Sequence, residues 1–453
     1  MPRLSRAAPN TSAAHGMAAL TVVMVLFFVM AMVAAYTNRS LIFEQRVSAN
    51  NYRATSAMNA SEAGIEWGIA MINGGRVDDN CLGSSNTAHA SFRERYLALQ
   101  SDGSYQTTKW PPVGVQKVFS PSCVLTAAGW NCSCPATGEP TLAYQAPPAP
   151  VFRVQFDTSV SPTLASGPGV IILKSRGCSN ISNASTASSD PNQVDSCHRA
   201  SGVTPNVDGL SDLRVALGLA RALPVPPPAA LTVGRNVSVA GAGALSAVNT
   251  DTSTALTVHA GTALPVTGVT PIGPAGSDAA ASTNSPDAQL ATLAAAAVAP
   301  RDLFFQATFG MEPARFSQQP GAVFMDCSAG CTATQVAAQI ISHPGRVLWL
   351  EGNLVLGDAG PLGTLTTPAM LVVNGDVTIS AAVVLNGFLY GRDIVWTAGS
   401  AGSLVRGAAV AKRDVLVNGP AAVVYDAAVL KIVSSTQGSF VRVPGSWQTT
   451  GIQ

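Results

Sequence analysis

The feature that most limits what this chain can fold into is a long uncharged run near its amino terminus. No Lys, Arg, Asp or Glu occurs between Arg6 and Arg39, and residues 17–36 read MAALTVVMVLFFVMAMVAAY. About 20 largely apolar residues are enough to cross a bilayer as a helix. A secretory signal peptide is the alternative, but its apolar region is normally about 7 to 15 residues long. We therefore expect one transmembrane helix over 17–36.

The charges that flank this run predict its orientation. Arg3 and Arg6 precede it, and basic residues favour the cytoplasmic side of a membrane. We therefore expect a single-pass protein with a cytoplasmic amino terminus and the bulk of the chain across the membrane.

The helix is expected to continue beyond the membrane. Neither Pro nor Gly occurs from Asn38 until Gly64. Gly74 and Gly75 are expected to end the helix, which would be roughly 85 Å long. The apolar residues of this stretch recur near helical spacing and form one stripe: Leu41, Val47, Ala54, Met58, Ile65, Ile69 and Ile72.

Four short segments carry a resemblance to a known family. They are HGMAALT at 15–21, FEQR at 43–46, NNYR at 50–53 and ASEAG at 60–64. Together they resemble the amino-terminal region of type IV pilus assembly proteins of the PilX kind, which are minor pilins. The resemblance covers about 75 residues of the 453.

The resemblance implies a maturation pathway and a set of partners. Residues 1–16 would be a leader that prepilin peptidase removes between Gly16 and Met17, and Met17 would then be N-methylated. Residues 17–75 would be the pilin helix, held in the inner membrane before assembly into an extracellular pilus. Other minor pilins, the major pilin and a tip adhesin would be the partners.

One position departs from the pattern of major pilins. These carry Glu at the fifth mature position, which is Thr21 here. In the family that carboxylate is thought to neutralise the amine of a neighbouring subunit inside the filament. A subunit at the tip has no neighbour above it, so the missing Glu suits a tip position. Thr21 is equally compatible with a neutral helix residue.

Residues 76–223 are expected to form a pilin-like head of mixed α and β structure. Strand-like patterns occur at 151–156, 169–175 and 213–223, and an antiparallel sheet packed on the long helix would bury Ile65, Ile69 and Ile72. The proline run at 224–228 marks a boundary.

A repeated phrase follows this boundary, once within 224–259 and then through 347–453. Each copy has a short apolar stretch, a turn with Asn or Asp, and a second β-branched stretch. Repeats near 20 residues predict a β-solenoid, which resembles bactofilin-like β-helices; an antiparallel sandwich is the alternative. Residues 260–346 are expected to be a loop, exposed over 268–286, and a helical insertion with helices at 289–298 and 332–342. The predicted fold class is thus α+β.

The cysteines are expected to form disulfides. Their number is even, none precedes residue 81, and the predicted topology places them in an oxidising compartment. Pairs between Cys327 and Cys331 and between Cys178 and Cys197 are locally plausible, although the spacing leaves the full pairing open. The first six would stabilise the head. The eight are Cys81, Cys123, Cys132, Cys134, Cys178, Cys197, Cys327 and Cys331.

No motif predicts catalysis, a cofactor or a metal. The five histidines are dispersed, zinc-like cysteine spacing is poor, and calcium at Asp190 and Asp195 lacks the spacing of a known loop. The 26 basic and 25 acidic residues nearly cancel, so nucleic acid is not an expected partner.

The sequence therefore predicts a minor pilin that primes pilus assembly and displays a β-rich part near the tip, where it would serve cell adhesion. Two rivals stay open. The first is a K-type minor pseudopilin of type II secretion, which commonly lacks the same Glu. The second is a membrane-anchored protein that binds or cleaves surface glycans, which would need a carboxylate cluster such as Asp376, Asp393 and Asp414.

Overall fold

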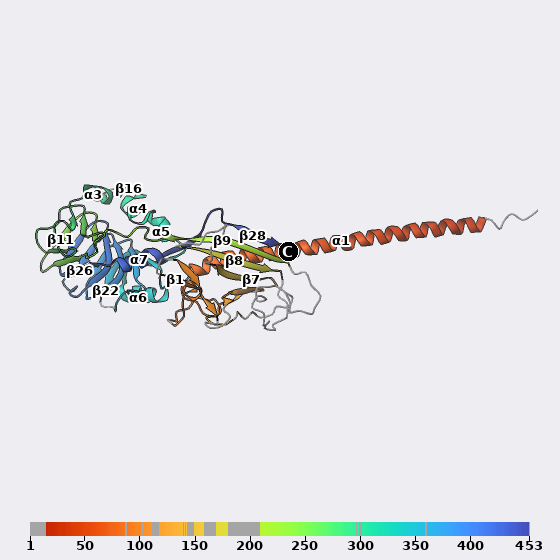
Figure 1. Ribbon diagram of the computed structural model, residues 1–453, viewed down its shortest axis with the longest axis horizontal. Coiled ribbons are helices and arrows are strands. Elements are labelled where there is room, and N and C mark those ends of the chain that lie inside the picture. Colours follow the sequence, from red (N-terminus) through yellow and green to blue (C-terminus); the bar gives the residue numbers. More distant parts are fainter. Residues whose placement is uncertain are drawn as a thin grey trace, which may run out of the picture.

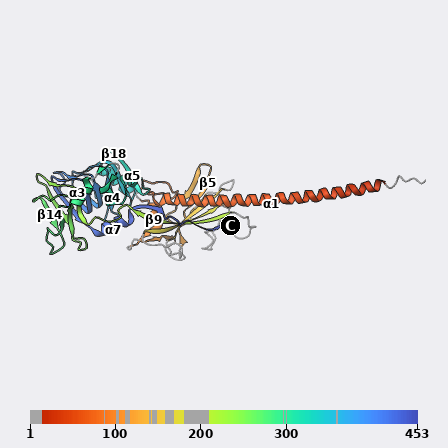
Figure 2. The same ribbon diagram turned by 90° about the horizontal axis from the view of Figure 1, so that it is seen from above.

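One helix, α1 (His15–Ile72), sets the long axis of the molecule. Its first half projects freely, its second half lies in a β-rich head, and a solenoid extends from the far end of the head (Figures 1 and 2). The computed structural model describes residues 15–86, 88–100, 104–110, 117–138, 140, 142, 149–157, 169–179, 209–295, 297–298, 301–357 and 360–452.

The end of α1 follows from its glycines, as the sequence predicts. The helix stops at Ile72, and the amide of Gly74 donates to the carbonyl of Met71 at 3.0 Å. Of the predicted apolar stripe, Ile65 and Ile72 are fully buried and Ile69 packs at the edge of the same core, whereas Leu41 and Val47 stay exposed.

The head contains an antiparallel sheet in the order β27-β9-β8-β7-β5-β6, and β28 also pairs with β9. The three strands expected from sequence are present in it. One face of the sheet packs on the second half of α1 through alternate residues such as Phe152, Val154, Leu173 and Leu213. The strands are β5 (Ser122–Thr126), β6 (Gly129–Ser133), β7 (Val151–Asp157), β8 (Val170–Cys178), β9 (Leu210–Arg221), β27 (Gly438–Arg442) and β28 (Gln448–Ile452).

Smaller elements complete the head. The short helix α2 (Phe92–Tyr96) begins with a capping box, in which Ser91 and Glu94 bond reciprocally to each other's backbone amides. It leads into the hairpin β1 (Leu97–Leu99) and β2 (Tyr105–Thr107). A second hairpin joins β3 (Lys109–Trp110) and β4 (Lys117–Val118).

The second large sheet is a β-solenoid. All of its strand pairs in the described residues are parallel, so the antiparallel sandwich is excluded. The chain winds through three faces, and apolar side chains fill the interior, including Leu371, Leu389 and Trp396. The strands are β10 (Ala229–Val233), β11 (Val237–Val239), β12 (Ala244–Val248), β13 (Leu256–Ala260), β14 (Val269–Ile272), β15 (Thr283–Asn284), β18 (Ala322–Thr332), β19 (Val347–Leu356), β20 (Ala369–Val373), β21 (Val377–Ile379), β22 (Val384–Gly391), β23 (Ile394–Trp396), β24 (Leu404–Ala411), β25 (Val415–Val417) and β26 (Pro420–Tyr425).

The order of the coils in space differs from their order in sequence. Strand β10, from the first repeat, pairs with β24, from the last repeat, and β13 then stacks on β10. The chain therefore enters the solenoid near its distal end, builds that end, and returns to begin the proximal end with β18 (Figure 2). Parallel stacking allows this because each coil needs only a neighbour of matching width, not a neighbour in sequence.

Two boundaries expected from sequence are consequently wrong. Residues 260–346 are not only a loop and helices, because β14, β15 and β18 within them are solenoid strands. Residues 438–452 do not continue the solenoid, because β27 and β28 pair with β9 in the head. Short apolar strands look alike in both sheets, and only their pairing distinguishes them.

The helices α3 to α7, within residues 288–436, lie outside the solenoid (Figure 1). The helix predicted at 332–342 is confirmed as α6 (Ala333–Ser342), with a capping box from Thr332. The helix predicted at 289–298 is present as α3 (Ala288–Ala295) but ends earlier, because residues 297–298 pair as a strand. Between them, α4 (Leu303–Phe309) follows the small hairpin β16 (Ala297–Val298) and β17 (Arg301–Asp302), and α5 (Pro313–Ser317) packs Phe316 on Trp349. Helix α7 (Ala427–Thr436) leads the chain back to the head.

Helix α1 and strand β8 cross at unusually short range, because glycines lie at the crossing. A Cβ atom added to Gly177 would lie 2.0 Å from the carbonyl oxygen of Ala57 on α1. One added to Gly64 would lie 2.2 Å from the Ser175 hydroxyl. Side chains at these positions would push the helix off the sheet.

We predict that Gly177→Ala destabilises the head by about 1–3 kcal/mol, since the methyl group would meet helix backbone that cannot move aside. Thermal unfolding of the full chain in detergent measures this loss. Gly83→Ala is the matched control, because a Cβ there meets nothing within 4 Å. Equal melting temperatures for the two variants would contradict the close crossing.

Candidate functional site

The free half of α1 carries a long exposed apolar surface. Its large side chains are exposed throughout, with Phe27 at 73% and Tyr36 at 78%. Among the described residues, this is the one helix long and apolar enough to cross a membrane. Soluble proteins rarely expose an apolar surface of this size, so lipid or other helices must cover it.

The exposed apolar surface does not end where the predicted membrane span ends. Leu41, Ile42, Phe43, Val47 and Tyr52 are also exposed, at 42% to 76%. Burial begins only at Ala57, where the head sheet covers the helix. The segment between the membrane span and the head therefore presents apolar side chains that this chain does not cover by itself.

The residues predicted to take part in maturation lie at the start of this helix. Gly16 and Met17 are in the first turn of α1, and Thr21 is exposed about one turn further on. Residues 1–14 of the predicted leader lie outside the described residues. At Thr21 the exposed helix surface thus carries a hydroxyl group within an otherwise apolar stretch.

The packed half of α1 ends at the junction between head and solenoid, where three helix C-termini meet. These are the ends of α1, α6 and α7, whose last carbonyls have no partner within their own helix. Each helix end also carries partial negative charge. Three arginines bind these carbonyls: Arg76, Arg93 and Arg346.

Each arginine links two or more of the parts that meet there. Arg346, at the start of β19, donates at 2.6 Å to both Ile72 and Gly74 at the end of α1. Arg93, from α2, donates to Ile72 at 3.3 Å and to Thr436 at the end of α7 at 2.9 Å. Arg76 donates from its Nε to Ile341 of α6 at 2.6 Å.

Burial makes these arginines unusual. Arg93 is 8% exposed and Arg346 is 4% exposed. Desolvation lowers the pKa of both guanidinium groups, and repulsion from Arg93 lowers the pKa of Arg346 further. The helix carbonyls and the nearby Glu94 offset this cost in part.

Asn73 ties α1 to the point where the chain returns from the solenoid. Its side chain donates to the carbonyl of Phe440 at 2.9 Å and accepts from the amide of Phe440 at 2.8 Å. Asn73 thus bonds to the middle of β27 as a paired strand residue would. Gly321, before β18, also donates to the Ser439 hydroxyl at 2.7 Å.

Sequence reasoning missed this junction, although a signal for it was present. Arg76 follows Gly74 and Gly75, and Arg346 follows Pro344 and Gly345, which are both helix-ending pairs. Basic residues near a helix C-terminus often bond the last carbonyls. The sequence could not show that the two ends lie side by side.

The carboxylates considered for a glycan site form a ladder along one corner of the solenoid. The backbone amides of Asp376, Asp414 and Asn236 each donate to the side chain of the preceding coil, at 2.9, 3.1 and 3.2 Å. Asp376 and Asp393 each pair with an arginine of the next coil. Asp376, Asp393 and Asp414 are therefore engaged in holding coils together.

Three disulfides are formed between described cysteines, as the sequence predicts. Cys81–Cys134 and Cys123–Cys132 lie in the head, and Cys327–Cys331 closes a bulge in β18. Cys178 is also disulfide-bonded. Its predicted partner Cys197 lies outside the described residues, as do Asp190 and Asp195.

Within the part of the chain that the structure describes, no group of three or more His, Cys, Asp or Glu side chains could hold a metal ion. The histidines are separated. His259 pairs with Asp287 at 2.7 Å, which lowers the pKa of Asp287, and His89 bonds to the Ser84 hydroxyl. His343 lies in the junction beside Arg76 and Arg346.

Comparison with known proteins agrees with the geometry of α1. The family described as PilX N-terminal matches residues 15–66, which span the exposed half of α1 and most of its packed half. The amino-terminal region is therefore type IV pilin-like. No curated protein matches the chain.

Comparison with solved structures adds little to the evidence from the family match. The chain is similar to the competence-associated pilin ComZ from Thermus thermophilus, with 10% sequence identity, coverage of 88% of this chain and 97% of that chain, and a TM-score of 0.18. At this TM-score the likeness says nothing about how the parts are arranged.

We predict that Arg346→Met lowers the free energy of unfolding by about 1.5–3 kcal/mol, because two carbonyls at the end of α1 lose a charged donor. Chemical denaturation of the full chain in detergent measures the loss. Arg235→Met is the control: its ion pair with Asp414 is exposed and 3.9 Å long, and we expect an effect below about 0.5 kcal/mol. Similar losses in both variants would contradict the assigned role of Arg346.

We also predict that acid weakens the junction through His343. Burial, and then the charges of Arg346 and Arg76, lower the pKa of this imidazole below its ordinary value near 6.5. The folded state therefore binds a proton less readily than the unfolded state. The resulting stability is complete above the unfolded pKa and declines as the pH falls toward the folded pKa.

The measurement is the melting temperature at pH 7.5 and pH 5.5. His343→Gln should show a smaller drop on acidification than the parent, because it removes the group that resists protonation. His89→Gln is the control, because His89 bonds to the Ser84 hydroxyl and does not lie beside Arg346. We expect this variant to show the same drop as the parent. An identical drop in the parent and His343→Gln would contradict this prediction.

Proposed function

We propose that this chain is a minor pilin of a type IV pilus. In this proposal prepilin peptidase cuts after Gly16, Met17 becomes N-methylated, and α1 holds the protein in the inner membrane with the head and solenoid in the periplasm. The protein then joins other minor pilins to prime assembly and is carried outside the cell with the pilus. Its role is structural and not catalytic.

The observation that carries the proposal is the division of α1 into two halves. The first half exposes a continuous apolar surface, and the second half is rigidly packed in a head. Such a helix can leave the bilayer only if neighbouring helices replace lipid around it. A helical filament core provides that replacement, since the helices of other subunits pack beside it.

The exposed segment between the span and the head supports the same role. Phe43 and Tyr52, at 68% and 76% exposure, would lie in water in an isolated membrane protein. In a filament they would face the helices of adjacent subunits. A simple membrane anchor gives no reason for this apolar extension.

The position of the solenoid supports a place at the filament tip. It extends from the head along the direction of α1, away from the free half of the helix (Figures 1 and 2). In a filament of parallel subunits, the space that the solenoid fills would be occupied by the head of the next subunit along the axis. A subunit at the tip has no such neighbour, so the solenoid fits there. The absence of a carboxylate at Thr21 also favours a position at the tip.

The solenoid would then be the part displayed to the surroundings, where it could contact a tip adhesin or a surface. Its likeness to bactofilin-like β-helices stays a prediction. A K-type minor pseudopilin shares the missing Glu and is the main rival, since a pseudopilus also has a tip. The ladder of Asp376, Asp393 and Asp414 gives little support to the glycan-cleaving alternative.

Mass spectrometry of the mature amino terminus tests the proposal. We expect a protein that begins with N-methylated Met17, and a Gly16→Val variant that keeps Met1 and accumulates in the inner membrane. Gly83→Val, in an open turn of the head, should be processed normally. A parent protein that retains Met1 would contradict the pilin assignment.

Placement is tested in the same strains. An epitope tag in the exposed loop 275–281 should label one end of purified pili. Label along the whole filament would contradict the tip position. Normal piliation in a deletion strain, together with a block in protein secretion, would favour the pseudopilin instead.

A further inference from the structure

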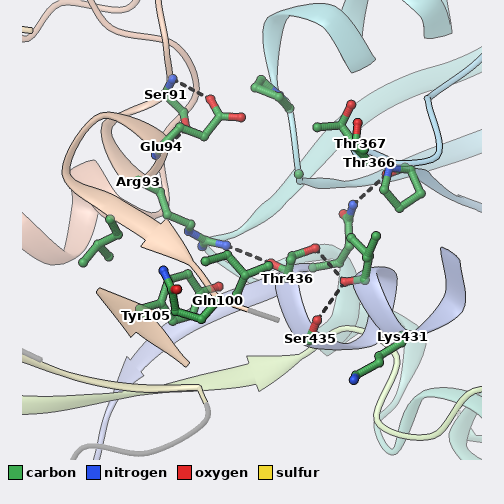
Figure 3. Close-up of a pocket in the computed structure, with 17 residues that line it drawn as sticks. Ser91, Arg93, Glu94, Gln100, Tyr105, Thr366, Thr367, Lys431, Ser435 and Thr436 are labelled. Atoms are coloured by element: carbon green, nitrogen blue, oxygen red, sulfur yellow. Dashed lines mark hydrogen bonds between the residues drawn. The ribbon is translucent and has the colours of Figure 1, made fainter. Parts of the chain in front are cut away.

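A cavity of about 470 Å³ opens at the junction of head and solenoid (Figure 3). Its walls come from three parts of the chain: α2 with the β1–β2 hairpin of the head, the solenoid loops at 344–345 and 366–368, and α7. Small-molecule sites typically occupy about 300–1,000 Å³ and favour boundaries between domains. The cavity has the size and the location of such a site.

Most of the cavity surface is apolar. Leu97 and Leu99 form the wall on the head side, Ile432 the wall on the α7 side, and Pro344 and Pro368 the wall on the solenoid side. Polar side chains lie around them, with Thr366 and Thr367 facing Glu94 across the opening (Figure 3). A ligand would therefore need an apolar body.

The charges at this place are unbalanced. Arg93 lines the cavity, and Arg346 is buried close enough to be repelled by it. Lys431 adds an exposed third cation at the rim. The carboxylate that lines the cavity, Glu94, is already bonded to the amide of Ser91 at 2.9 Å. An anion in the cavity would offset the excess positive charge.

One lining group also lacks a partner. Gln437 is 1% exposed, and its side-chain nitrogen donates to Pro368 at 3.0 Å. Its side-chain oxygen is buried without a hydrogen-bond partner in the described part of the chain. Buried polar groups in folded proteins are normally satisfied. Because this oxygen is an acceptor, the anionic group of a ligand would lie away from it, toward Arg93 and Lys431.

We propose that the junction cavity binds a small amphipathic anion. Its apolar body lies between Leu97, Leu99 and Ile432, and its carboxylate or similar group lies near Arg93 and Lys431. Because the walls come from both head and solenoid, a bound ligand bridges them and holds the solenoid more firmly on the head. This site is independent of pilus assembly.

The test uses the full chain in lipid nanodiscs and two matched probes, 4-phenylbutyrate and the uncharged 4-phenylbutanol. Isothermal titration should show that the acid binds at least about fivefold more tightly than the alcohol. Lys431→Gln should weaken binding of the acid by about threefold to fivefold. Arg301→Gln removes an exposed cation that does not line the cavity and should leave the affinity unchanged.

A variant that fills the cavity separates true binding from partition into lipid. Leu99 is 38% exposed at the rim, so Leu99→Trp can enter the cavity without disrupting the core, and Thr367→Trp fills it from the opposite side. Binding should be lost in the filled variant that keeps the parental circular dichroism. Equal affinity for acid and alcohol, no effect of Lys431→Gln, or unchanged binding in the filled variant would each overturn the proposal.

Discussion

The arrangement of the whole molecule depends on how three helix ends are satisfied at one place. The C-termini of α1, α6 and α7 bring unpaired carbonyls and partial negative charge together between head and solenoid. Arg76, Arg93 and Arg346 bond those carbonyls, and Asn73 fastens α1 to the returning strand β27. The solenoid is thus fixed to the end of the pilin-like helix itself. These bonds add to the two covalent connections between head and solenoid, the segment 222–228 and α7.

The solenoid is inserted between two adjacent head strands, and this insertion also fixes it to one end of the head. Strand β9 leads out to β10, and α7 leads back to β27, which pairs with β9. Both connections leave from one end of the head sheet, so the solenoid can be large without disturbing the packing of β7, β8 and β9 on α1. The head keeps its antiparallel order, and the extra mass lies along the axis (Figure 1).

Inside the solenoid a different interaction maintains order. Side chains of one coil accept from backbone amides of the next, as Asn353 does for Asp376 and Asp393 for Asp414. These bonds fix the register of parallel strands whose apolar residues would also fit if shifted by two. The bond from Asn236 to Asp414 continues the pattern across the point where the chain order breaks. The same type of bond, from a backbone amide to a side-chain oxygen, thus joins coils whose residues are 178 positions apart in sequence.

The sequence by itself determined the elements whose causes are local. The charge-free run at 17–36 predicts an apolar helix long enough to cross a membrane, Gly74 and Gly75 end it, and the capping residue Thr332 starts α6. The tertiary structure alone decided the pairing of strands. Nothing local distinguishes β27, which returns to the head, from a solenoid strand, or reveals that β10 stacks on β24. The same holds for the arginine junction and its cavity, because they arise where segments distant in sequence meet, and contacts of that kind are set by the packing of the whole chain.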